Sequence, residues 1–87
     1  MTNSHVFDTY AKTSKGRIMH FNVVLDENNQ EKALNYAKHW LARIGEAQAI
    51  LDANNCYLCH SGEAPAEIRK QIAVHGYAIF KLEGCPK

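Results

Sequence analysis

The first part of the chain alternates between apolar and polar positions, which is the pattern of β-strands with one buried face. Residues 5–10 (HVFDTY) have strand composition, and residues 17–25 (RIMHFNVVL) predict a clearer strand, rich in β-branched and aromatic side chains. The polar stretch 11–16 between them predicts a hairpin with a longer loop. We expect Phe7 to face the core from the first strand. From the second strand the core face should carry Met19, Phe21, Val23 and Leu25.

The period then changes to that of a helix. Asn28, three residues before Glu31, has the form of a capping arrangement, and Gly45 supplies a C-terminal stop. Between them the apolar positions recur at helical spacing: Ala33, Leu34, Ala37, Trp40, Leu41 and Ile44. This segment therefore predicts the first helix.

The rest of the chain predicts a strand, a helix and a strand. The strands are residues 47–53 (AQAILDA) and 77–82 (YAIFKL), and the helix runs from Pro65 to His75. The order is β-β-α-β-α-β, which predicts an α/β (α+β) two-layer sandwich: a four-stranded mixed sheet with both helices on one face. If each helix returns the chain across the sheet, the second, third and fourth strands run parallel.

Length and charge narrow the class of protein. We expect residues 1–87 to form one domain, because 87 residues lie at the small end of what folds alone. The formal net charge of +1 argues against a nucleic-acid partner. No apolar run is long enough to span a membrane, and the N-terminal residues have no secretory signal pattern. The expected location is the cytosol.

Three cysteines carry the clearest chemistry. In the predicted topology Cys56 and Cys59 follow the third strand and Cys85 follows the fourth, so all three sulfurs should lie at one edge of the sheet. A tetrahedral zinc ion takes four thiolate or imidazole ligands. We therefore predict a zinc module whose fourth ligand is His60, with His5 as the alternative.

Two other interpretations of the cysteines stay open. Cys59 lies shortly before the second predicted helix, whose N-terminus lowers the pKa of a nearby thiol. Cys56 and Cys59 would then form the redox pair of a thiol protein, with Cys85 as the resolving partner. Alternatively the thiols are inert, because free cysteines often only fill buried space.

A polar face of the predicted hairpin is the last candidate site. It carries Asp8 and Tyr10 from the first strand and His20 and Asn22 from the second. A register near Phe7–Phe21 sets Asp8 beside His20. Such a pair is either an oriented general base or a polar patch on a solvated face. We expect no catalytic activity, so this face predicts an interaction module that meets a protein partner or a second copy of the chain.

Several motifs in fixed order resemble one known family. It is a family of short bacterial proteins named domain of unknown function two thousand and twenty-four, and the resemblance covers about residues 5–85. The matching motifs are His5–Tyr10 (HVFDTY), Met19–Val23 (MHFNV), Trp40-Leu41, Ile44-Gly45, Cys56-x-x-Cys59-His60-Ser61, Ala64-Pro65, Gly76-Tyr77 and Glu83-Gly84-Cys85. The resemblance implies a small α/β domain of bacterial source and places the cysteines inside the family pattern. It implies no activity and no catalytic residue.

Overall fold

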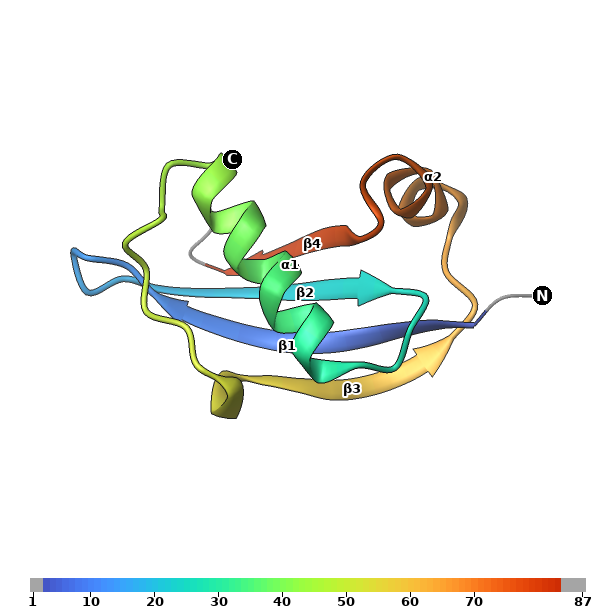
Figure 1. The fold of residues 1–87 in the computed structure, drawn as a ribbon, viewed down its shortest axis with the longest axis horizontal. Helices are drawn as coiled ribbons and strands as arrows, with labels where there is room; N and C mark the ends of the chain where they lie inside the picture. Colours follow the sequence, from blue (N-terminus) through green and yellow to red (C-terminus); the bar gives the residue numbers. More distant parts are fainter. Residues whose placement is uncertain (1–2, 84–87) are drawn as a thin grey trace.

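The computed structural model describes residues 3–83, which form one antiparallel sheet and two α-helices (Figure 1). The sheet order is β3-β1-β2-β4. The elements in chain order are β1 (Ser4–Lys12), β2 (Ile18–Leu25), α1 (Gln30–Arg43), the 3-10 turn η1 (Ala53–Asn55), β3 (Cys56–Gly62), α2 (Ala66–His75) and β4 (Ala78–Glu83). The predicted α+β class and the predicted β-β-α-β-α-β order are both confirmed.

The hairpin of β1 and β2 is the centre of the sheet. Phe7 pairs with Val23 rather than with the predicted Phe21, so the register is displaced by two positions. A displacement by an even number of residues leaves every side chain on its predicted face. Phe7, Met19, Phe21, Val23 and Leu25 are accordingly all buried in the main core.

The mixed sheet that we predicted is wrong, because each strand pairing among residues 3–83 is antiparallel. Only α1 returns the chain along the full length of the sheet, from the end of β2 to the start of β3. Its length of 14 residues, about 21 Å at 1.5 Å per residue, suits that path over the sheet face. There it packs Ala33, Ala37, Trp40 and Leu41 on the core.

The second helix takes a shorter path, and this corrects the prediction that both helices share one face. β3 ends and β4 begins at the same end of the sheet, on opposite edges. The linker of residues 63–65 crosses the end of the sheet, and α2 then lies beside β2 and β4, seen nearly along its axis (Figure 1). Its Ile68 and Ile72 pack with Val6, Val24 and Ala78, on the face opposite α1.

An ion pair fixes α2 at this position. The Arg69 guanidinium donates to both carboxylate oxygens of Asp26, at 2.5 and 3.3 Å, and to the Ser4 hydroxyl at 3.0 Å. The hydrogen bonds from Arg69 lower the pKa of Asp26, and the hydroxyl of Ser4 adds to this effect. Just after the helix, Gly76 adopts the left-handed conformation at a φ of 86° and ends it.

The third strand lies later in the chain than predicted. Residues 47–53 form no strand, and Ile50 makes only an isolated bridge to Lys12. The strand is Cys56–Gly62, a segment that the sequence places after the third strand. Gln30, the first residue of α1, positions its start by donating from Nε2 to the backbone oxygens of Ala53 and Cys56, at 2.8 and 2.7 Å.

The first residue of α1 follows directly after the N-cap residue of the helix. Asn29, one residue later than the predicted Asn28, accepts from the backbone N–H of Lys32 at 3.1 Å. Neither helix within residues 3–83 has the length and hydropathy that a membrane crossing requires.

Candidate functional site

The cysteine motif lies along β3, on one edge of the sheet. Cys56 is the first residue of this strand and is fully buried in the main core. Cys59 is exposed. It is the extra residue of a β-bulge, since Leu58 pairs with Phe7 while His60 pairs with the neighbouring Val6. Cys85 lies outside the residues that the structure describes.

An extended strand separates the two described thiols. At about 3.3 Å per residue, the Cα atoms of Cys56 and Cys59 lie roughly 10 Å apart, whereas a disulfide joins Cα atoms at most about 7 Å apart. His60 pairs with Val6, and His5 pairs with Ser61. Both histidines therefore lie near the start of β1, whereas Cys56 pairs with Thr9 further along that strand. Within the described part of the chain, no three histidine, cysteine, aspartate or glutamate side chains lie close enough to share a metal ion.

The environment of Cys56 is that of a structural thiol. Burial raises the pKa of this thiol, and the hydroxyl of Thr9, which donates to Cys56 Sγ at 3.6 Å, opposes that shift. A thiol held protonated inside a core is a poor nucleophile and a poor metal ligand. In this fold Cys56 fills space beneath α1.

The face of the sheet opposite α1 carries an ordered polar cluster, which we call the open face cluster: Asp8, Tyr10, His20 and Tyr57. His20 Nε2 donates to one carboxylate oxygen of Asp8, and the Tyr57 hydroxyl donates to the other at 3.2 Å. The Tyr10 ring stacks on His20 with centroids 4.1 Å apart. Asp8 and His20 are thus in contact, as expected, although their residues are diagonal in the observed register.

This hydrogen bond affects Tyr57 directly. Donation to Asp8 raises the pKa of the Tyr57 hydroxyl, because the bond exists only while the phenol is protonated. Asp8 is therefore engaged on both of its oxygens. The side chains of the cluster are therefore held in place on the sheet face by hydrogen bonds and ring stacking with one another.

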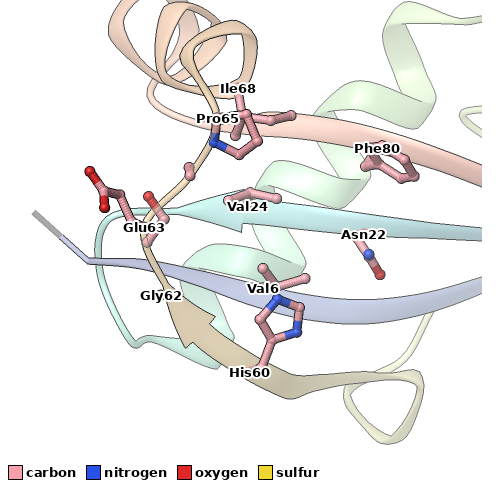
Figure 2. A pocket seen from close by; sticks show the side chains of 11 residues that line it. Val6, Asn22, Val24, His60, Gly62, Glu63, Pro65, Ile68 and Phe80 are labelled. Atoms are coloured by element: carbon pink, nitrogen blue, oxygen red, sulfur yellow. The ribbon is translucent and has the colours of Figure 1, made fainter.

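A pocket of about 250 Å³ adjoins this cluster at the end of the sheet beside α2. Figure 2 shows Val6 and Val24 on its floor, His60 on the β3 side and Phe80 on the β4 side. Ile68 and Pro65 close it toward α2. The lining is mostly apolar, and it draws on all four strands.

Asn22, which lines this pocket, has a side-chain oxygen without a hydrogen-bond partner among the described residues. This atom, Oδ1, is buried. The cross-strand neighbours of Asn22 are Asp8 and Phe80. An ionised carboxylate accepts only, and a phenyl ring has no donor, so neither neighbour can satisfy this acceptor.

Sequence reasoning placed Asp8, Tyr10, His20 and Asn22 on this face, but it missed Tyr57 and Phe80. Tyr57 was missed because the sequence places its segment after the third strand and not within it. Phe80 was assigned to a strand, and its alternation with Ile79, which packs on the main core, is the signal that turns it to the open face.

The fold and the open face define a small α+β domain with an antiparallel sheet covered fully on one side only. The chain belongs to the family described as "Domain of unknown function (DUF2024)", whose model matches residues 2–82. The matched region ends before Cys85, whereas the resemblance seen in the sequence extended to that residue.

A solved structure is similar to this chain over nearly its whole length. The NMR structure of protein NE1680 from Nitrosomonas europaea is 44% identical and has a TM-score of 0.86. The match covers 97% of this chain and 99% of that one. The search of curated proteins gave no match.

Proposed function

We propose that this protein is an interaction module that docks another protein on the open face of its sheet. The observation that carries the proposal is the exposure of aromatic side chains beside an ordered polar cluster. Phe80 is 52% exposed and Tyr57 is 47% exposed. Large aromatic side chains are enriched where proteins bind each other, and the Tyr57 hydroxyl adds a polar end to one of these two.

The dimensions of the face favour a protein over a small molecule. The eight residues of β2 extend about 26 Å, and four strands span about 14 Å between the outer two. Their product is roughly 360 Å² before side-chain relief is added. Counted on both partners this is roughly 720 Å², below the ~1,000 Å² of a stable interface, so we expect a weak, transient contact.

The charges of the face favour a partner of different sequence. Among residues 3–83, Asp8, Glu63 and Glu83 lie on or beside it, and strand alternation adds the ammonium of Lys12. A second copy of the chain would bring the same excess of negative charge against itself. We therefore expect a partner whose contact surface is apolar at its centre and basic at its rim.

Site-specific photo-cross-linking in the source organism tests the proposal. A benzophenone amino acid replaces Phe80 in one strain and Val74, which is 76% exposed on α2, in the control strain. We expect one protein, identified by mass spectrometry, to be linked through position 80 and not through position 74. The purified partner should bind the wild-type chain, with weaker binding to Tyr57→Ala and at high salt.

Two outcomes would overturn this function. If position 80 gives no adduct beyond those of position 74, the face docks no protein. If its adduct has twice the mass of the chain, the face joins two copies, which is the homo-oligomer alternative.

The zinc module and the thiol redox protein stay predictions, as does the cytosolic location. Both use Cys59, the exposed thiol of the bulge, and both need Cys56 to leave the core. Elemental analysis of protein purified without chelator is the test. Near-stoichiometric zinc that is lost in Cys85→Ala supports the first hypothesis. Metal-free protein with a Cys56–Cys59 disulfide that mild reductant opens supports the second.

A further inference from the structure

A second pocket, of about 260 Å³, lies between the two helices on the side of the sheet that α1 covers. We call it the basic cleft, and two residues from each of three parts of the chain line it: Trp40 and Arg43 of α1, Gln71 and His75 of α2, and Tyr77 and Lys81 at β4. No acidic side chain among residues 3–83 lines it. The cleft thus gathers basic groups from separate elements without a carboxylate to neutralise them.

The polar groups that the cleft leaves free are mainly hydrogen-bond donors. The side-chain oxygen of Gln71 already accepts from the backbone N–H of Ile79 at 3.4 Å. The hydroxyl oxygen of Tyr77 already accepts from Arg43 Nη1 at 3.3 Å. Within the described part of the chain, Arg43 and Lys81 form no ion pair with a carboxylate. A ligand of this cleft must therefore supply acceptors.

Trp40 adds a buried donor to this set. It is only 6% exposed, and its indole N–H has no acceptor among residues 3–83. In that part of the chain, Asn22 Oδ1 is the one side-chain polar atom that is both unpaired and closed to solvent, so the Trp40 N–H keeps a path to water. A buried donor of this kind gains free energy when an acceptor reaches it.

The basic groups exceed what the helix ends require. Arg43 is the last residue of α1 and His75 the last of α2, and each helix C-terminus carries about −0.5 of a charge. Two such ends contribute about −1, whereas Arg43 and Lys81 contribute two positive charges. The cleft therefore keeps a net charge of about +1 even with His75 neutral. Lys81 lies on a strand, so no helix end accounts for it.

We propose that the basic cleft binds a phosphate group, either the free ion or a small phosphate ester. The oxygens of a phosphate accept hydrogen bonds and carry close to two negative charges near neutral pH, and the planar fork of an arginine matches them. A carboxylate has only two oxygens in one plane, fewer than the donors that reach the cleft from three elements. The volume equals roughly nine water molecules at ~30 Å³ each, which holds a phosphate and a short ester chain. This site is independent of the docking function on the opposite face.

Titration of the purified chain with sodium phosphate and with glycerol 3-phosphate tests the proposal. Sodium chloride keeps the ionic strength constant. Trp40 is the single tryptophan, so its fluorescence reports on the cleft, and the amide resonances of Tyr77 and Lys81 give a second readout. We expect saturable changes in both at millimolar concentration or below. The tighter of the two ligands identifies the source of the phosphate.

A matched pair of variants separates the cleft from the general charge of the chain. Lys81→Gln removes an exposed lysine of the cleft and should weaken binding about tenfold, because it removes a hydrogen bond between charged groups. Lys70→Gln removes the same charge from α2 outside the cleft and should leave the affinity unchanged.

Three outcomes would overturn the proposal. The first is the absence of a saturable change with either ligand at ten millimolar, and the second is an equal loss of affinity in the two variants. The third is binding of acetate as tightly as phosphate, which assigns the cleft to carboxylates. None of these outcomes bears on the cross-linking through position 80, so the two functions fail separately.

Discussion

Replacing Asn22 with leucine should stabilise the protein, although Asn22 lies in a central strand of the sheet. The substitution removes the buried oxygen that has no hydrogen-bond partner and keeps nearly the same side-chain volume. The apolar neighbours in the pocket, Val6, Val24 and Phe80, can pack against the new methyl groups. Since Asn22 Oδ1 contributes no hydrogen bond, the substitution removes a cost and breaks no bond at this atom.

The size of the effect follows from the cost of a buried, unpaired polar group, which is about 1–3 kcal/mol. The pocket is open to water at its mouth, so we expect the lower end, about 1 kcal/mol. For a domain of this size, that raises Tm by about 4–8 °C. It raises the urea midpoint by roughly 0.3–1 M at m values of ~1–3 kcal/mol/M.

Urea denaturation followed by fluorescence measures this directly, because Trp40 is the single tryptophan and is buried in the core. The control is His60→Leu, which adds leucine to the same pocket but replaces an exposed residue. If Asn22→Leu gains no more stability than His60→Leu, the unpaired oxygen carries no cost and the reasoning about the pocket fails.

Three further predictions concern other parts of the molecule. A thiol reagent should modify Cys59 in the native protein and Cys56 only on unfolding, because Cys56 is buried and burial raises the pKa of its thiol. Peptide mapping after equal reaction times measures both rates, and equal rates would contradict this prediction. The pKa of Asp26 is lowered in the folded state, so the ionised carboxylate stabilises the fold at pH values above its ordinary pKa of 3.8, and this stabilisation is lost as the pH falls below that value. Urea titrations from pH 5 to 2 should show the loss of stability, and Arg69→Gln should make that loss smaller. Gly76→Ala should cost about 1 kcal/mol or more in Tm-based measurements, since its φ is 86° and the added Cβ would lie 3.3 Å from a tyrosine hydroxyl; unchanged stability would refute the strain.

The elements with strong periodicity could be predicted from the sequence. The hairpin strands and α1 have apolar residues at the spacing that their core requires, and their faces were correct even where the register was displaced by two. The faces of an alternating strand depend only on parity, which the sequence shows. Its register depends on the whole set of cross-strand contacts, which the sequence does not show.

The direction of β4 could not be predicted in this way. A helix between two strands suggests a crossover and a parallel pair. Here the connection that contains α2 joins the two edge strands at one end of the sheet and does not return the chain along it. What decides the path is the position of β3 at the opposite edge from β4. That position follows from contacts such as Gln30 with Cys56, made by residues far apart in the sequence.

The cysteine motif shows the same dependence on context. Two cysteines three residues apart bring their sulfurs together on a turn or at a helix start, but an extended strand turns them apart. The sequence does not identify this strand, because only Cys56 of β3 is buried and no alternation marks the strand. An edge strand with solvent on most of its side chains lacks the apolar signal by which strands are recognised. The exposed Tyr57 that this strand contributes is therefore a functional candidate that only the fold reveals, since pairing of β3 with β1 brings it to Asp8.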